Sequence, residues 1–274
     1  MDREKQMKEQ DKRIDRNLKK IKHKLIVMSG KGGVGKSTMA VNLAVSLSGK
    51  GYSAGLLDVD LHGPNTLKML NIEDEKIISD GQSMLPIKYS DNLKVISIAA
   101  LLDQKDAPVI WRGPLKMGVI RQFIADVKWD DLDWLIVDSP PGTGDEPLTV
   151  AQIMKGSKAV LVTTPQEISL MDVRKSVHFS NKLDLPIVGI IENMSGLICP
   201  HCYKKINLFK SGGGKKMADS MKIDFLGSIP LDEKIMESTD SGIPYFTRYK
   251  DSAAGIAFNE IVDKIIQNEI KGGK

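Results

Sequence analysis

The chain has 274 residues, of which 41% are apolar, and a formal net charge of +4. This length and composition allow a substantial core, so we expect a single α/β domain over residues 24–270. No apolar run approaches the roughly 18 residues of a membrane span, and the N-terminus is charged, which argues against a transmembrane helix and a secretory signal and predicts a cytoplasmic protein.

The positive charge is concentrated at the N-terminus. Residues 1–24 hold ten Lys or Arg and five Asp or Glu, whereas the remaining residues hold 29 basic against 30 acidic side chains. A nucleic-acid-binding protein carries its basic excess on the folded body, so we expect no nucleic-acid partner. Residues 1–23 are mixed in sign and poor in apolar side chains, which predicts a flexible arm or a frayed, solvated helix, with a partner-docking arm as the alternative.

A glycine-rich stretch over residues 30–38 reads G-K-G-G-V-G-K-S-T and satisfies the phosphate-loop pattern GxxxxGK[ST]. An apolar run over 25–28 precedes it and a helical pattern over 37–48 follows, which is the strand, loop and helix order that the motif requires. Lys36 is expected to contact the β- and γ-phosphates and Ser37 to bind Mg²⁺, while glycines let backbone N–H groups approach the phosphates. The loop residues predicted to bind the nucleotide are Gly30, Lys31, Gly32, Gly33, Val34, Gly35, Lys36, Ser37 and Thr38.

Two apolar strand patterns end in acidic residues. The pattern over 53–60 ends in Asp58 and Asp60, which share one face of a strand, and the pattern over 133–138 ends in Asp138. Open α/β sheets bind ligands at the carboxyl ends of their strands. We therefore expect all three acids beside Mg²⁺ and the attacking water, with Asp138 holding Mg²⁺ directly or through water. Solvated acids at strand ends are the alternative.

Alternating strands and helices continue along the chain. Further strands are predicted over 93–99, 158–163, 186–192 and 225–230, and helices over 115–127, 168–183 and 253–270. This alternation predicts an α/β fold with a mostly parallel, doubly wound central sheet and helices on both faces. Residues 71–92 are polar and are expected to form a surface excursion. The last helix carries acidic residues among its polar positions, so we expect no membrane partner.

Lys31, directly after the first glycine, makes the loop resemble the deviant phosphate loop of the MinD and ParA class of dimeric ATPases. In that class the extra lysine reaches across a two-fold interface to the partner's nucleotide, so the resemblance implies a homodimer and that catalytic role for Lys31. The same resemblance implies that Asp60 orients the hydrolytic water and Asp58 supports the metal site. It also implies that Asn193 and the segment at Pro230 contact the adenine of ATP.

Within that class, the segment I-E-N-M-S-G-L-I-C-P-H-C over 191–202 resembles the Mrp-type iron-sulfur cluster carriers, also called the ApbC family. The segments L-L-D-V-D-L-H-G-P-N, V-D-S-P-P-G-T-G-D and T-T-P-Q-E carry the same likeness, which spans roughly residues 24–270. The resemblance implies an ATP-hydrolysing carrier that receives a cluster from donors and passes it to iron-sulfur apoproteins. Some bacterial relatives carry an extra small N-terminal domain where this chain has only the charged arm, so we expect no function that rests on that domain.

Cys199 and Cys202 enclose Pro200 and His201 in a C-x-x-C segment. This spacing can point two thiolates at one centre, but tetrahedral zinc and cubane iron-sulfur clusters usually take four protein ligands. An isologous dimer would bring two such pairs to its axis. We expect a [4Fe-4S] cluster that bridges two subunits; bridging zinc and a redox dithiol or plain surface thiols remain alternatives. His201 lies inside the turn and is expected not to be a ligand.

Two other functions remain open. A MinD- or ParA-like positioning or partition ATPase would act on a membrane or on DNA, and the two cysteines would then be incidental. A metabolic kinase would need a substrate pocket that the sequence does not reveal.

Overall fold

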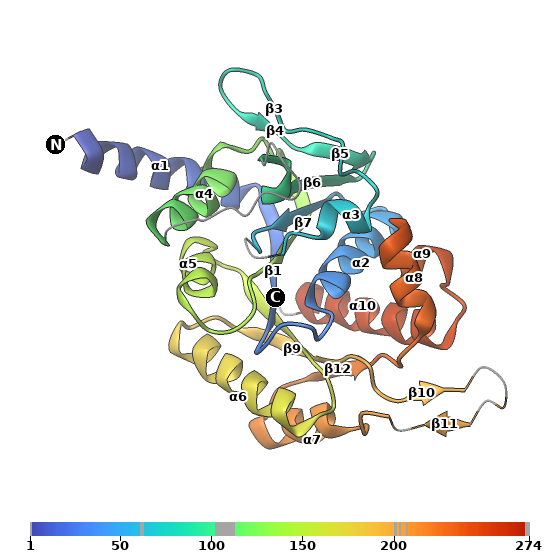
Figure 1. Ribbon diagram of the computed structural model, residues 1–274. Helices are drawn as coiled ribbons and strands as arrows, with labels where there is room; N and C mark the ends of the chain where they lie inside the picture. Colours follow the sequence, from blue (N-terminus) through green and yellow to red (C-terminus); the bar gives the residue numbers. More distant parts are fainter. Residues whose placement is uncertain are drawn as a thin grey trace.

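A computed structural model describes residues 2–60, 63–101, 113–199, 202, 204–206 and 208–271. Its central sheet has eight strands in the order β12-β9-β8-β1-β7-β2-β6-β5 (Figure 1). All neighbouring strands are parallel except β5 and β6, which are antiparallel. The strands of this sheet are β1 Ile21–Ser29, β2 Ala54–Asp58, β5 Ile87–Ser90, β6 Leu93–Ser97, β7 Leu132–Asp138, β8 Lys158–Thr163, β9 Ile187–Glu192 and β12 Phe225–Ser228. The predicted α/β class and mostly parallel sheet are confirmed.

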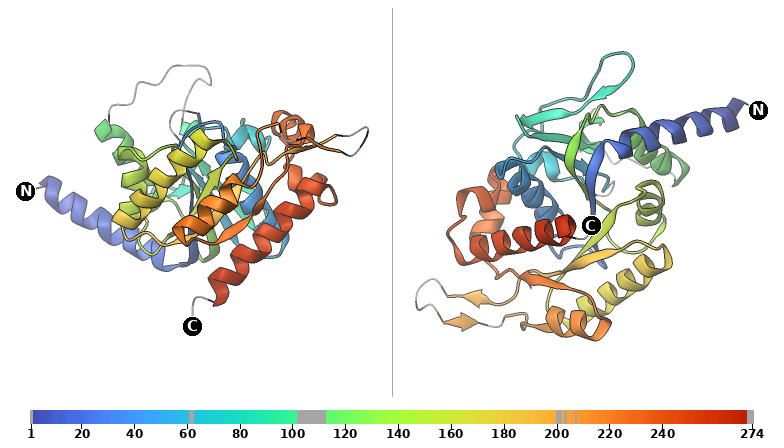
Figure 2. Two further views of the ribbon diagram at one scale, coloured as in Figure 1. Left: turned by 90° about the horizontal axis from the view of Figure 1, so that it is seen from below. Right: turned by 180° about the vertical axis from the view of Figure 1, so that it is seen from behind.

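Helices cover both faces of the sheet (Figure 2). The helices are α1 Asp2–Lys19, α2 Lys36–Gly49, α3 Thr66–Met69, α4 Gly113–Asp126, α5 Asp145–Ile153, α6 Glu167–Lys182, α7 Gly213–Met221, α8 Glu233–Ser241, α9 Tyr245–Arg248 and α10 Ala253–Lys271, with a 3₁₀ turn over Ile98–Leu101. Two short hairpins, β3 Ile78–Ser79 with β4 Met84–Leu85 and β10 Leu197–Ile198 with β11 Lys205–Ile206, lie outside the main sheet. Among the described residues, no helix combines the length and the apolarity needed to cross a bilayer.

The core has two halves, one on each face of the sheet. Strand β1 contributes to both because side chains alternate along a strand: Leu25 and Val27 pack with α2 and α10, whereas Ile26 and Met28 pack with α1, α4, α5 and α6. A strand buried on both faces reads as a continuous apolar run, which is why the central strands were recognisable from the sequence.

The structure adds elements that the sequence patterns did not indicate. Within the expected surface excursion over 71–92, β5 pairs antiparallel with β6 and forms one edge of the sheet. Helices α5, α7, α8 and α9 are also additional. All of these elements are short, and an edge strand with one neighbour needs less apolar surface than a central strand.

The N-terminal helix differs from the expected solvated arm in its second half. Ile14 and Leu18, four positions apart on one helical face, are 3% and 5% exposed. The Asn17 side-chain amide donates hydrogen bonds to the carbonyl oxygens of Ile124 and Ala125, at 3.0 and 2.9 Å, and so caps the C-terminus of α4. This half of α1 is therefore part of the packed body, while its first half projects beyond it (Figure 2).

Candidate nucleotide site and cysteine hairpin

The phosphate loop lies between β1 and α2, at the carboxyl edge of the sheet. Gly33 and Gly35 have φ angles of 77° and 87°, a region that favours glycine. A Cβ built on Gly32 or Gly33 meets nothing within 4 Å, so open space borders the backbone where a phosphate can approach. At Gly35 a Cβ would lie 2.3 Å from Nδ2 of Asn193, so packing also requires this glycine.

Lys36 lies in the first turn of α2 and is only 6% exposed. Its Nζ lies 2.5 Å from Oδ1 of Asp138 and 3.4 Å from Oδ2 of Asp60. Burial lowers the pKa of Lys36, but the two carboxylates outweigh burial and raise the pKa above its ordinary value. The amine is therefore a fixed cation beside the phosphate loop.

Asp58 and Asp138 are opposite each other on neighbouring strands, and both are buried. Asp58 is fully engaged: its Oδ2 accepts from the hydroxyls of Thr66 and Ser97, at 2.8 and 3.0 Å, and its Oδ1 accepts from the backbone N–H of Asp60 at 3.0 Å. Burial, reinforced by the charge of Asp138, raises the pKa of Asp58 to about 7. The role that these contacts fit is support of its neighbours rather than direct metal ligation.

Asp138 has a free coordination position. Its Oδ1 accepts from Lys36, whereas its buried Oδ2 has no hydrogen-bond partner among the described residues. Burial raises the pKa of Asp138, and the cation of Lys36 opposes that rise. A buried carboxylate oxygen without a donor is the type of atom that a divalent cation satisfies, so these residues fit a bound Mg²⁺.

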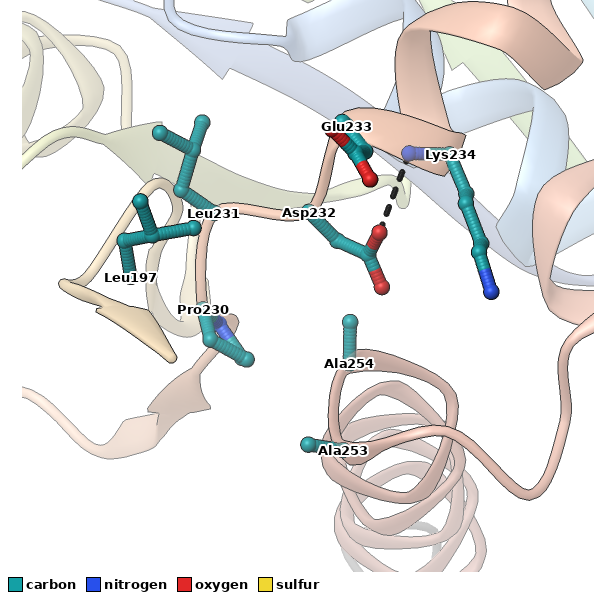
Figure 3. A pocket seen from close by; sticks show the side chains of 8 residues that line it. All are labelled: Leu197, Pro230, Leu231, Asp232, Glu233, Lys234, Ala253 and Ala254. Atoms are coloured by element: carbon teal, nitrogen blue, oxygen red, sulfur yellow. Dashed lines mark hydrogen bonds between the residues drawn. The ribbon is translucent and has the colours of Figure 1, made fainter. Parts of the chain in front are cut away.

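The two residues expected at adenine lie on neighbouring segments. Asn193 is 5% exposed and donates from Nδ2 to the carbonyl oxygen of Val34 at 2.9 Å, which ties it to the phosphate loop. The next segment is paired to it, because Ser195 N–H donates to the carbonyl oxygen of Ile229. Pro230 lines a pocket of about 230 Å³ between the end of β12 and the start of α10 (Figure 3). A pocket of this size fits part of a ligand rather than a whole nucleotide.

Lys31, the second residue of the loop, is half-buried. Its backbone carbonyl accepts from the Ser29 hydroxyl at 2.9 Å, and its amine has no polar partner among the residues that the structure describes. The role of Lys31 across a two-fold interface stays a prediction.

The cysteine pair lies on the β10-β11 hairpin, which begins shortly after β9 ends and so starts from the same edge of the sheet as the phosphate loop. Cys199 is half-buried, Cys202 is exposed, and neither is in a disulfide. The N–H of Cys199 donates to the carbonyl oxygen of Lys204 at 3.0 Å, which closes the turn. His201 lies outside the described residues. Within the described part of the chain, no three His, Cys, Asp or Glu side chains are arranged so that they alone could hold a metal ion.

Sequence patterns missed Glu192, a wholly buried carboxylate at the end of β9. It accepts hydrogen bonds from Ser195 and from the N–H groups of Gly212 and Gly214, on both sides of the cysteine hairpin. The signal that could have found it is present, because Glu192 ends an apolar strand just as Asp58 and Asp138 do.

Comparisons with known proteins identify the family of the chain. The family model described as ParA, NUBPL iron-transfer P-loop NTPase, matches residues 20–266. An iron-sulfur cluster carrier protein of Methanocaldococcus jannaschii is 47% identical and aligns with 100% of this chain and 93% of its own length. A cytosolic Fe-S cluster assembly factor NUBP2 homolog of Dictyostelium discoideum is 49% identical over 90% of this chain and 95% of its own length.

Solved structures show the same fold. An ADP-bound nucleotide-binding protein of Archaeoglobus fulgidus, in which cobalt was found, has a TM-score of 0.78 and 36% identity, and the match covers 90% of this chain and 96% of that protein. The cell division ATPase MinD of Pyrococcus furiosus has a TM-score of 0.66 at 24% identity, covering 90% and 99% of the two chains. At that identity the likeness to MinD concerns the fold alone.

Proposed function

The chain belongs to the ParA family of NUBPL-type iron-transfer P-loop NTPases, and from this premise we propose that it is a homodimeric ATPase whose two subunits hold one labile [4Fe-4S] cluster and deliver it to apoproteins. Membership makes it an iron-sulfur carrier with ATPase activity. The bridging cluster, the dimer, the direction of transfer and the residue roles are the proposed part.

The observation that carries the proposal is that the nucleotide-site residues and the cysteine hairpin start from the same edge of the sheet. The phosphate loop, the acids Asp58, Asp60 and Asp138, and the hairpin with Cys199 and Cys202 all follow carboxyl ends of parallel strands. A nucleotide at the loop and a cluster at the hairpin would therefore be held by neighbouring strand ends, which is what coupling between them requires.

Each residue of the nucleotide site has a proposed role. The loop amides and Lys36 bind the β- and γ-phosphates of ATP, and Lys31 reaches the nucleotide of the second subunit. Mg²⁺, which neutralises phosphate charge when bound, is held by Ser37 and Asp138. Asp60 orients the attacking water; its present contact with Lys36, at 3.4 Å, keeps it beside the phosphates.

Asp58, Asn193 and Pro230 have supporting roles. Asp58 supports the metal site from a buried position opposite Asp138, and it holds Asp60 by accepting the backbone N–H of that residue. Asn193 and Pro230 contact adenine, and this assignment is supported by the link between Asn193 and the phosphate loop.

Four thiolates are the expected ligand set of the cluster, and each subunit supplies Cys199 and Cys202. The exposure of Cys202 supports a cluster that acceptor proteins can reach. The proposed partners are cluster donors and iron-sulfur apoproteins. We propose no nucleic-acid partner and no membrane partner. The cytosol is the proposed compartment, in line with the printed name of the Dictyostelium relative.

Anaerobic reconstitution tests this proposal. The protein is incubated with iron and sulfide, desalted, and analysed for iron, sulfide, zinc and iron-thiolate absorption. We expect about four irons and four sulfides per dimer, and loss of both in Cys199→Ser and Cys202→Ser. Lys204→Ala changes the same hairpin without removing a thiol and serves as the control. Zinc at one ion per dimer, or unchanged iron in both cysteine variants, would contradict the bridging cluster.

A second assay tests transfer. The loaded protein is mixed with an apo-ferredoxin that takes a [4Fe-4S] cluster, in the presence of an iron chelator that traps released iron. We expect holo-ferredoxin to form faster than the chelated complex, because transfer through a protein contact keeps iron out of solution. Formation of the chelated complex alone would contradict a carrier role.

A further inference from the structure

The end of β9 connects the two halves of the proposed site. Glu192 and Asn193 are consecutive, so their side chains point to opposite faces of the sheet. Their contacts agree: Asn193 reaches Val34, which packs in the core half under α2, whereas Glu192 reaches the start of α7, which packs in the other half.

Glu192 holds both ends of the segment that carries the cysteines. Before the hairpin, the Ser195 hydroxyl donates to Oε1 at 2.5 Å. After the hairpin, the N–H of Gly212 donates to Oε1 at 2.9 Å and that of Gly214 donates to Oε2 at 2.5 Å. Ser228 adds a longer contact of 3.4 Å from the neighbouring strand. One carboxylate therefore closes the loop from residue 195 to residue 214.

Breaking the hydrogen bonds of the Glu192 carboxylate is costly. Glu192 is 0% exposed, and among the described residues no Lys or Arg pairs with it. Its charge is balanced by hydrogen bonds and by the N-terminus of α7, so losing one donor would leave a buried charge less satisfied. At Gly214 a Cβ would lie 3.0 Å from Oε2, so the chain is packed directly on the carboxylate.

Asn193 connects the same strand end to the phosphate loop. Its Nδ2 donates to Val34, and its backbone N–H donates to the carbonyl oxygen of Thr163 at 2.7 Å. The close packing of Asn193 against Gly35 means that a shift of the loop must also shift Asn193.

We propose that Glu192 is a positioning residue that transmits the nucleotide state of the phosphate loop to the cysteine hairpin. A displacement of the loop moves Asn193, and Glu192 then moves both ends of the hairpin as one unit. The inference rests on the proposed function, since it describes how ATP acts on the thiols that would hold the cluster.

The test measures thiol reactivity without any cluster. Reduced, metal-free protein is alkylated with iodoacetamide, and the rates at Cys199 and Cys202 are followed by mass spectrometry with and without a non-hydrolysable ATP analogue. In the wild type we expect the two states to differ by about fivefold or more. In Glu192→Gln, which keeps the shape and removes the charge, we expect a ratio near one, with analogue affinity within about twofold of wild type.

Two further variants separate transmission from a purely structural role. Ser228→Ala removes only the long contact outside the hairpin and should keep the wild-type ratio. Ser195→Ala removes one of the short contacts at a hairpin end and should give an intermediate ratio, which keeps the test decisive if Glu192→Gln does not fold. A wild-type ratio of one, or a wild-type ratio retained in both Glu192→Gln and Ser195→Ala, would overturn the inference.

This result is distinguishable from failure of the proposed function. If reconstitution shows no cluster while the thiol rates still respond to nucleotide through Glu192, the proposed cargo is wrong and the transmission stands. If the cluster binds and the rates respond equally in all variants, only the role of Glu192 is wrong.

Discussion

At the scale of single residues, the buried charges around Lys36 determine how the nucleotide site behaves. One cation lies against two carboxylates, and a third carboxylate, Asp58, lies one strand away from Asp138. In such a cluster the loss of one charge changes the protonation of the others. The two lysines of the loop differ in this respect, because Lys36 is part of the cluster and Lys31 is not.

This difference gives a paired prediction for the lysines. Lys36→Ala removes the cation at the phosphates, so we expect nucleotide affinity to fall by a hundredfold or more, on the order of 3 kcal/mol. Lys31→Ala should keep affinity within a few-fold and lose ATP hydrolysis or nucleotide-driven dimerisation. Titration with a fluorescent ATP analogue and a phosphate-release assay measure the two effects. An equal loss of binding in both variants would contradict a role of Lys31 across the interface.

Asp58 makes stability depend on pH. Its pKa is raised to about 7 by burial and by Asp138, so the folded chain binds this proton more tightly than the unfolded chain does. Between roughly pH 4 and pH 7, raising the pH therefore removes stability, on the order of 2–4 kcal/mol.

Urea unfolding of nucleotide-free, Mg²⁺-free protein at pH 5 and pH 8 measures this effect. We expect Asp58→Asn to reduce the loss of stability between the two pH values. The amide of the new asparagine can still donate hydrogen bonds to the hydroxyl oxygens of Thr66 and Ser97, because these hydroxyl groups can rotate and accept. Asp91→Asn, at an exposed acid whose pKa is lowered by its ion pair with Lys88, should leave the dependence between pH 5 and pH 8 unchanged, because Asp91 is ionised at both values. A dependence that is the same in Asp58→Asn as in the wild type would exclude Asp58 as its source.

At the scale of elements, α1 is divided between a packed half and a projecting half. Leu18→Ala should lower the free energy of unfolding by about 2–4 kcal/mol, because a buried apolar side chain is removed from a close-packed contact. Met7→Ala, at a side-chain position that is 53% exposed, should change it by less than about 0.5 kcal/mol. Chemical denaturation measures both. If both substitutions changed the free energy of unfolding by equally little, the whole helix would be a solvated arm, as composition alone suggested.

The elements also show where sequence patterns succeed and fail. Central strands such as β1 and β7 were predictable because burial on both faces produces long apolar runs. The phosphate loop and the strand-end acids were predictable because their chemistry requires particular residue types at fixed spacing. The packing of α1 was not, since only Ile14 and Leu18 mark it and their partners lie about a hundred residues away on α4. The hydrogen bonds of Glu192 with Gly212 and Gly214 were not predictable because the donors are backbone N–H groups 20 and 22 residues along the chain, and backbone groups leave no signal in the residue types.

At the scale of the whole molecule, the proposed cluster needs two chains. Each chain offers two thiols on one hairpin, so removal of the cluster should remove four bonds that hold the subunits together. We expect loaded protein to sediment as a dimer at micromolar concentration, and to shift toward monomer after iron is chelated. Cys202→Ser should be insensitive to chelation under the same conditions. A loaded monomer would contradict the bridging arrangement.

The strand order has a consequence for how the chain is synthesised. Strand β1 is made first, yet its neighbours in the sheet are β7 and β8, which end at Asp138 and Thr163. Helix α1, which leads into it, packs on α4. During translation β1 therefore has no partner in the sheet until β7, which begins at Leu132, has been made, and its unpaired backbone and apolar faces are exposed for that time. The highly charged helix α1 directly precedes β1 and can keep this segment in solution for that time, before the second half of the helix packs on α4.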